Sequence, residues 1–262
     1  MVFNRHLGRT FKKSSFDYHL TRRGYPNNLF TDIIKFSKIN KASIILDAGC
    51  GSGLSTLPFA KKGYSIIGID FSEELLKIAK SEAINDVPEY LLGPFENYNF
   101  KQKFDLIISG QAFHWFDEKI AYKKCFEILN NKGYLAIFAK FHDYKRSDFL
   151  LKLKNIFEKN CEFFPEGLHH HDYEKDYIKE MNDYNMFTNI KSKTYDYFLE
   201  YSKEDYRDYI ISNTWMLKLD VDKQANVMNE IDSLMSNYKW PMKIPLGAVL
   251  VLGRKLSVDE HF

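Results

Sequence analysis

Hydrophobic and polar positions follow two different rhythms along the first half of the chain. Between residues 43 and 133, short runs of consecutive apolar residues are separated by longer segments in which apolar residues recur every three to four positions. Short apolar runs are typical of buried strands, and the longer period is typical of amphipathic helices. The repeated order of strand and helix predicts a parallel sheet with helices on both faces.

The pattern also predicts where each element lies. Pro26 suits the start of a first helix, and Ser72 suits the N-cap of a later one with acidic residues in its first turn. The expected strands span residues 43–48, 64–70, 88–93, 104–110 and 133–140, and the expected helices span 26–39, 54–62, 72–85 and 117–130.

The pattern is weaker beyond residue 140. It predicts helices at 146–160, 203–217 and 221–238 and strands at 192–201 and 245–255. Helices between the last two strands would form an insertion above the sheet edge. We therefore expect an α/β fold: a Rossmann-like, doubly wound, mostly parallel sheet with a helical cap inserted before the last strand. The single domain 1–262 would comprise a lid at 1–25, a core at 26–200 and 244–255, and a cap at 201–243.

Composition and charge narrow the class of protein. The 262 residues are 45% hydrophobic, and 37 basic against 35 acidic residues give a net charge of +2 without basic blocks. This balance disfavours nucleic acid and membrane surfaces as partners. Three cysteines without CxxC spacing indicate a reducing compartment. No window approaches the roughly 20 apolar residues of a membrane span, so a soluble cytoplasmic protein is expected.

The segment "ILDAGCGSGLS" (45–55) places three glycines directly behind an apolar run. A glycine-rich turn between a strand and a helix brings bare backbone to the carboxyl edge of a parallel sheet, where such folds bind ligands. A dinucleotide site would need a third glycine at position 54, which is Leu54. Asp70 ends the next strand about 20 residues downstream, where a carboxylate accepts hydrogen bonds from ribose hydroxyls. These features together favour a nucleoside without a pyrophosphate.

Residues 45–80, "ILDAGCGSGLSTLPFAKKGYSIIGIDFSEELLKIAK", resemble the signature of class I S-adenosylmethionine-dependent methyltransferases. The segments "GPFENYNF" (93–100) and "FDLIISGQAFHWFD" (104–117) are similar to that family's segment beside the adenine and to its fourth-strand motif. Within the superfamily, "QAFHWFD" and "YHLTRRGYP" (18–26) resemble the branch that includes trans-aconitate-type methyltransferases. The resemblance covers roughly residues 16–140, with weaker support from "PLGAVLVLGRK" (245–255).

The resemblance implies a role for individual residues. Asp47 would orient the methionine amino group of S-adenosylmethionine, Asp70 would hold the ribose, and Arg22 with Tyr18 would hold the methionine carboxylate from the lid. Relatives often have Asp where this chain has Pro94, so the contact to the adenine amino group must come from backbone or Glu96. The remaining expected cofactor residues are Ala48, Gly49, Cys50, Gly51 and Gly53 in the turn, Phe71, Phe95 and Glu96 around the adenine, and Ser109, Gly110 and Gln111 near the sulfur.

Methyl transfer from a sulfonium requires alignment and exclusion of water more than it requires a base. A carboxylate acceptor is already ionised at neutral pH, whereas a hydroxyl acceptor would benefit from a base such as His114. His114 is as well explained as a structural histidine, and Trp115 as a packing residue. The expected acceptor is a small molecule that enters between the lid and the cap, where the candidate contacts are Trp115, Tyr206, Arg207, Tyr209 and Trp215.

Other functions stay open at this point. A cofactor-binding protein without catalysis has the same binding motif, and an NAD(P)-dependent oxidoreductase shares the same kind of sheet. His169, His170 and His171 are consecutive, so they cannot all face one metal ion on regular structure, and a solvated loop with no metal is expected. The product expected beside the methylated acceptor is S-adenosylhomocysteine. The sequence does not indicate an oligomeric state.

Overall fold

The computed structural model describes residues 23–83, 87–162, 164 and 170–257. Its central element is a sheet with the strand order β3-β2-β1-β4-β5-β7-β6. The first five strands in this order pair in parallel, and β7 runs antiparallel to both of its neighbours. The predicted Rossmann-like, mostly parallel sheet is therefore confirmed.

The strands follow the predicted positions closely, and the last three are longer than predicted. They are β1 (Ile44–Ala48), β2 (Ser65–Asp70), β3 (Glu89–Leu92), β4 (Phe104–Gly110), β5 (Leu129–His142), β6 (Phe187–Tyr201) and β7 (Met242–Lys255). The helices that cover or extend this sheet are α2 (Asn27–Ser37), α3 (Leu57–Lys61), α4 (Glu73–Ser81), α5 (Glu118–Ile128), α6 (Asp148–Asn160), α7 (His170–Asp183), α8 (Lys203–Ile211), α9 (Thr214–Leu217) and α10 (Val221–Ser236).

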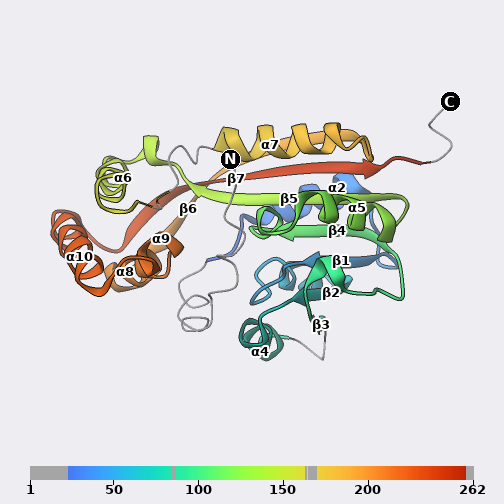
Figure 1. Ribbon diagram of the computed structural model, residues 1–262, viewed down its shortest axis with the longest axis horizontal. Helices are drawn as coiled ribbons and strands as arrows, with labels where there is room; N and C mark the ends of the chain where they lie inside the picture. The colour runs from blue at the N-terminus through green and yellow to red at the C-terminus, as the bar shows by residue number, and fades with distance from the viewer. Residues whose placement is uncertain (1–22, 84–86, 163, 165–169, 258–262) are drawn as a thin grey trace.

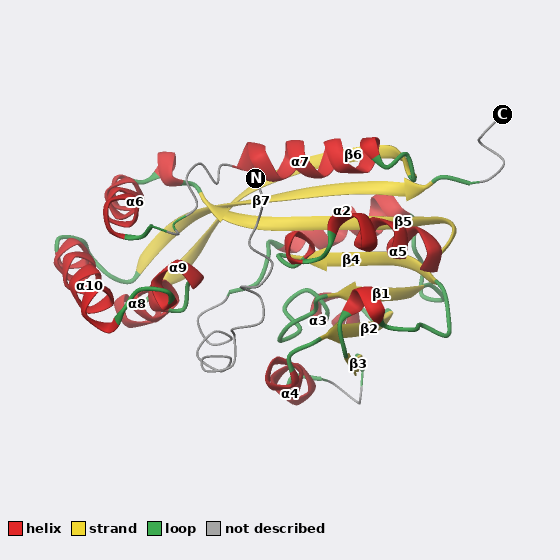
Figure 2. Cartoon of the chain, viewed as in Figure 1, coloured by secondary structure: helices red, strands yellow, loops and turns green. Residues whose placement is uncertain are grey.

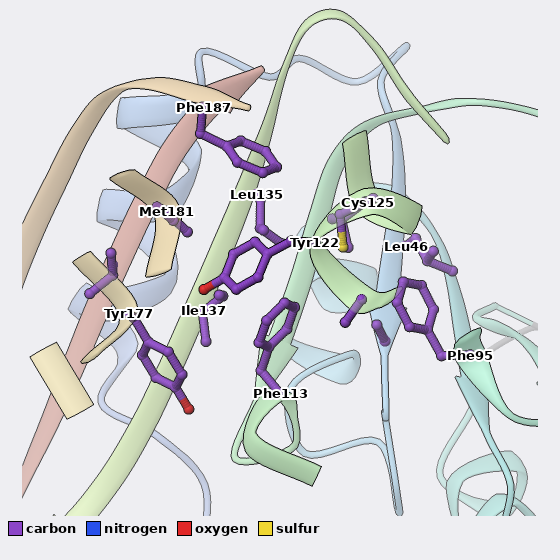
Figure 3. Close-up of a cluster of buried hydrophobic side chains, with 14 of the residues drawn as sticks. Leu46, Phe95, Phe113, Tyr122, Cys125, Leu135, Ile137, Tyr177, Met181 and Phe187 are labelled. Carbon is purple, nitrogen blue, oxygen red and sulfur yellow. The ribbon is translucent and has the colours of Figure 1, made fainter. Parts of the chain in front are cut away.

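Two hydrophobic clusters lie on opposite faces of the sheet. Side chains of α5 and α7, such as Tyr122 and Met181, meet Leu135 and Ile137 of β5 on one face (Figure 3). Alternate residues of the same strands, such as Ala136 and Phe138, meet α2 and Phe59 of α3 on the other face. This alternation follows from the period of two in a strand, and it explains why the central strands read as continuous apolar runs.

The last three strands extend beyond the parallel ones and carry the cap. Figures 1 and 2 show α6, α8, α9 and α10 gathered beyond the carboxyl ends of the parallel strands. These helices share a third cluster with the ends of β6 and β7, centred on Phe149, Tyr206, Met216 and Ile231. The cap therefore includes α6, which precedes β6, in addition to the helices inserted between β6 and β7.

The sequence interpretation was wrong in two places. His170 and His171, predicted in a solvated loop, lie in the first turn of α7, and no helix was predicted over residues 170–183. His169 lies outside the described residues. The helix predicted at 203–217 is broken, because α8 ends before Ser212 and α9 begins after Asn213. Within the described residues, no helix is long and apolar enough to cross a membrane.

Candidate active site

The glycine-rich turn connects β1 to α3 at the carboxyl edge of the sheet. Gly49, Gly51 and Gly53 all have positive φ angles, of 73°, 53° and 86°. A Cβ on Gly49 would lie 2.5 Å from the Cβ of Ala112, whereas a Cβ on Gly51 would meet nothing closer than Leu75, at 3.8 Å. Gly49 is therefore required by contact with the neighbouring loop, whereas a Cβ at Gly51 would make only an ordinary van der Waals contact, so the backbone there is less crowded.

Ala48 and Cys50, beside these glycines, are both buried. The Cys50 N–H donates to the carbonyl of Ile69, and the Ala48 carbonyl accepts a hydrogen bond from Ser109 Oγ at 2.8 Å. Burial raises the pKa of the Cys50 thiol well above its ordinary value, so the thiol stays protonated and unreactive. These two residues hold the turn against the sheet.

Asp47 lies at the end of β1, fully buried beneath the turn. Its Oδ2 accepts hydrogen bonds from the hydroxyls of Ser55 and Thr56, both at 2.6 Å. Its Oδ1 is buried without a hydrogen-bond partner among the described residues. Burial raises the pKa of this carboxyl to about 7, against the opposing effect of the two hydroxyls. The unpaired oxygen marks a position where a donor from a ligand is needed.

Asp70 ends β2 and fastens the turn to the start of α4. Its Oδ2 accepts from the Gly51 N–H and its Oδ1 from the Ser72 N–H, both at 2.9 Å. Burial raises the pKa of the Asp70 carboxyl, and these backbone donors oppose the rise. Each carboxylate oxygen retains a second lone pair, so the group can still accept from two vicinal hydroxyls.

Next to Asp70, two large apolar side chains are exposed at the ends of adjacent strands. Phe71 is 49% exposed and Leu92, which pairs with Asp70 in the sheet, is 55% exposed. Phe95 is only 2% exposed, because its ring packs against Phe100 and Phe116 in the core. The contact of the Phe95 ring with an adenine stays a prediction, and the packing of this ring leaves little of it accessible to a ligand.

Glu96, beside Phe95, is partly buried, and its Oε1 accepts from the Asp117 N–H at 3.2 Å. This bond joins the segment after β3 to the start of α5. The carboxylate of Glu96 thus has a structural role in addition to any role toward the adenine.

The end of β4 is tied to both of its neighbours. Ser109 is buried and bonded to β1, and Gly110 lies beside the hydroxyl of Tyr25, which a Cβ at this position would meet at 2.9 Å. Gln111 has a φ of 57°, and its side chain bonds the backbone N–H of Lys140 at 2.6 Å and the carbonyl of Lys140 at 3.2 Å. The Ser109 and Gln111 side chains therefore fix the strand ends, which leaves their backbone as the part that can face a cofactor.

His114 and Trp115 lie in a short 3₁₀ helix, Phe113–Trp115, directly after β4. The His114 ring lies 4.9 Å from the Trp115 ring and 6.0 Å from the Tyr173 ring of α7, between ring centroids. Burial lowers the pKa of His114 to about 4. The imidazole is therefore neutral at physiological pH, and it is a weak base compared with an unperturbed histidine.

The structure gives three of the acceptor candidates contacts or burial within the cap. Arg207 donates from Nε to Asp232 of α10 at 2.9 Å, so its charge is already paired. Tyr206 is fully buried in the cap, and Trp215 packs against Phe157 and Phe164. Arg207 and Trp215 are therefore explained by contacts within the cap, which the sequence could not show because their partners come from distant elements.

Tyr209 stays a candidate for contact with the acceptor. It packs beside His142, a residue that sequence reasoning missed. Its ring lies 5.3 Å from the ring of His142, which ends β5. The hydroxyl of Tyr206 is 3.1 Å from His142 Nε2. A single histidine at the end of an apolar strand carries no motif, so only the strand's position beside β4 indicates that His142 belongs to this edge.

Tyr18 and Arg22, expected in the lid, lie outside the described residues. The first described residue, Arg23, bonds Asp205 of α8 at 2.9 Å, and its carbonyl accepts from Lys140 Nζ. The chain therefore passes between the sheet edge and the cap as it enters α2. Among the described residues, no group of three or more His, Cys, Asp or Glu side chains could hold a metal ion.

The carboxyl edge thus combines the Asp70 carboxylate, the backbone of Gly51, the unpaired Oδ1 of Asp47 and the exposed ring of Phe71. These groups suit a nucleoside that bears an amino group. Residues 46–137 match the family model described as a methyltransferase domain. Residues 46–137 are therefore a methyltransferase domain, and the protein is an S-adenosylmethionine-dependent methyltransferase.

The chain is similar to several named proteins. It is 28% identical over 243 residues to an uncharacterised methyltransferase of Schizosaccharomyces pombe, covering 87% of this chain and 88% of that one. It is 28% identical to CRG1 of Saccharomyces cerevisiae, described as a probable S-adenosylmethionine-dependent methyltransferase, over 68% of this chain and 58% of that protein. A malonyl-[acyl-carrier protein] O-methyltransferase of Priestia megaterium is 31% identical over 37% of this chain and 36% of its own length.

Among solved structures, a provisionally assigned type II methyltransferase from Anaeromyxobacter dehalogenans aligns with a TM-score of 0.64. The alignment covers 89% of this chain and 97% of the other, at 18% identity. This likeness supports the fold alone.

Proposed function

We propose that the protein transfers the methyl group of S-adenosylmethionine to a small-molecule acceptor, and that the acceptor atom is a carboxylate oxygen. The observation that carries the proposal is the contrast at the edge of the sheet. The cofactor side has acidic groups and open backbone at Asp47, Gly51 and Asp70, whereas the titratable residue after β4, His114, has a pKa lowered to about 4.

On the cofactor side, each proposed contact follows from a geometric feature. The unpaired Oδ1 of Asp47 would accept from the methionine amino group, and the two oxygens of Asp70 would accept from the ribose hydroxyls. Phe71, exposed at the end of β2, would stack against the adenine. Arg22 and Tyr18 are retained as proposed partners of the methionine carboxylate, from the lid.

When bound, the sulfonium supplies an electrophilic methyl group with a neutral thioether as its leaving group. The chain's own residues have two tasks, which are alignment and exclusion of water. The Gln111 side chain holds the end of β4 against β5, and Ser109 holds it against β1, so the floor of the reacting site is fixed on both sides. Tyr173 and the cap would cover it.

A carboxylate acceptor is the acceptor for which this site needs no general base. The carboxylate attacks the methyl carbon, the carbon–sulfur bond breaks, and the ester and thioether products are neutral, so no proton has to be removed. His114, with its lowered pKa, is a weak base, which disfavours hydroxyl acceptors that need deprotonation. The similarity to malonyl-[acyl-carrier protein] O-methyltransferases, whose name specifies methylation on oxygen, gives distant support.

The test is methyl transfer from S-adenosylmethionine with a tritiated methyl group to a panel of carboxylic acids. We expect a product that releases volatile tritiated methanol when treated with alkali, because methyl esters hydrolyse and methyl ethers and amines do not. Products that are all stable to alkali would contradict the carboxylate assignment. The Asp70→Ala variant serves as the control, since it should form no product.

A further inference from the structure

A group of aromatic residues with polar ends lines the junction between sheet and cap. In the antiparallel ladders, His142 of β5 pairs with Leu246 of β7, which pairs with Tyr197 of β6. Residues paired in this way project from the same face of a sheet. Tyr209 of α8 packs on His142, and Tyr201 lies 6.0 Å from Tyr209 between ring centroids. We call His142, Tyr197, Tyr201, Tyr206 and Tyr209 the tyrosine wall.

The Tyr197 hydroxyl distinguishes this wall from ordinary core packing. It is buried and has no hydrogen-bond partner among the described residues. Its side chain contacts both the cap cluster and the cluster on the α2 face, so it lies at the seam between them. An unpaired buried hydroxyl is unfavourable, and most such groups in native proteins are satisfied by a partner. A ligand that supplies this partner accounts for the hydroxyl.

The arginines around the wall are already paired. Arg23 bonds Asp205 at 2.9 Å, Arg207 bonds Asp232 at 2.9 Å, and Arg146 bonds Asp196 at 3.3 Å. Burial raises the pKa of Tyr197 and Tyr206, so both phenols are neutral at physiological pH. The described part of the wall thus offers aromatic faces and neutral hydroxyls. The Arg23 guanidinium lies 5.4 Å from the centroid of the Tyr201 ring, so one carboxylate can find a cation at that end of the wall. Further carboxylates on the same ligand would lose their hydration against the aromatic faces.

We propose that His142, Tyr197 and Tyr209, the partly exposed members of the tyrosine wall, bind the body of the methyl acceptor. In this arrangement Tyr197 Oη hydrogen-bonds an oxygen on that body, and the acceptor is therefore a monocarboxylate with an apolar or aromatic body. This inference rests on the proposed function, and it makes Tyr197 a specificity-determining residue. A small polycarboxylate, such as the substrate of a trans-aconitate-type enzyme, is the alternative that it excludes.

The test is isothermal titration of the full chain, saturated with S-adenosylhomocysteine, with 4-hydroxycinnamate and separately with trans-aconitate. We expect 4-hydroxycinnamate to bind at least about 10-fold more tightly, a difference of about 1.4 kcal/mol. Tighter or equal binding of trans-aconitate, or no binding of either acid, would overturn the proposal.

Two tyrosine variants on the same strand separate recognition from structure. Tyr197→Phe should weaken 4-hydroxycinnamate binding about 3- to 10-fold, as for loss of one hydrogen bond. Tyr195→Phe is the matched control, because the Tyr195 hydroxyl is already bonded to Asp32 at 2.9 Å. It should leave the affinity unchanged. Neither variant should alter the affinity for S-adenosylhomocysteine, and Tyr197→Phe should not lower the melting temperature.

An unchanged affinity for 4-hydroxycinnamate in Tyr197→Phe would refute the role of this hydroxyl. Failure of the proposed function would look different: the acid would bind at the wall but would yield no alkali-labile product with S-adenosylmethionine. Conversely, esterification of trans-aconitate in preference to 4-hydroxycinnamate would support carboxylate methylation and refute the tyrosine wall.

Discussion

The two sides of the active-site edge are built in different ways. The cofactor side consists of short-range features: a turn, two strand ends and a helix start, all between Asp47 and Ser72. The acceptor side joins the end of β5 to α8 and β6, which lie some 60 residues apart in sequence, as the Tyr206–His142 contact shows. The proposed cofactor contacts are therefore visible in a local motif, whereas the proposed acceptor contacts depend on tertiary packing.

The difference between the cofactor side and the acceptor side is tested most strongly by a substitution at Asp70. Asp70→Ala removes the expected ribose clamp and also the bonds to the Gly51 and Ser72 N–H groups. Hydrogen bonds to a charged group contribute about 1.5–3 kcal/mol each, so we expect at least about 100-fold weaker binding of S-adenosylhomocysteine. Titration calorimetry measures this, and circular dichroism should show a retained fold. An affinity within a few-fold of wild type would refute the assignment.

Asp47 should couple stability to pH. Its folded-state pKa is raised to about 7, above its ordinary value, so between about pH 4 and 7 the folded chain holds a proton that the unfolded chain has released. Stability should fall as pH rises through this window, by up to roughly 4 kcal/mol from this group. Urea unfolding across pH should show this component in wild type and not in Asp47→Asn.

Burial also raises the pKa of Asp70, so part of the pH dependence should persist in Asp47→Asn. The difference between wild type and variant isolates Asp47. Parallel curves for the two proteins would show that Asp47 is ionised in the folded protein and would contradict the prediction.

Two glycines of the turn should respond differently to the same substitution. Gly49→Ala brings a methyl group to 2.5 Å from Ala112, whereas Gly51→Ala mainly forces alanine into a left-handed conformation, at about 1–2 kcal/mol. We expect the larger drop in melting temperature for Gly49→Ala. Gly51→Ala should keep a higher melting temperature and still weaken cofactor binding. Equal melting temperatures would contradict the distinction.

The smallest effect is expected at Arg207. Its bond to Asp232 joins two partly exposed side chains, and such pairs contribute about 0–1 kcal/mol. Arg207→Gln should therefore leave the KM for a carboxylate acceptor within about twofold of wild type. A large increase in KM would show that Arg207 leaves Asp232 to bind the acceptor.

Much of the fold could be predicted because strand and helix periods are local. The start of α4 follows from the N-cap Ser72, whose side chain accepts from the N–H of Leu75. Helix α7 was missed, because its buried face depends on Tyr173, Tyr177 and Met181 reaching a core formed by other elements. No local signal distinguishes that segment from a polar loop.

The site shows the same division. The positions of Asp47, Gly51 and Asp70 could be read from the sequence, since Asp47 and Asp70 lie at the ends of two adjacent parallel strands and Gly51 lies in the turn after the first. The burial of the Phe95 ring could not be read in the same way, because it depends on Phe100 and Phe116. His142 and Tyr197 were missed because only the register of β5, β7 and β6 brings them to one face.

The central claim is that the glycine-rich edge binds S-adenosylmethionine, and titration calorimetry of the purified chain with S-adenosylhomocysteine tests it most directly. The account predicts saturable binding of one equivalent per chain, lost in Asp70→Ala. A folded sample that binds no S-adenosylhomocysteine would contradict the account.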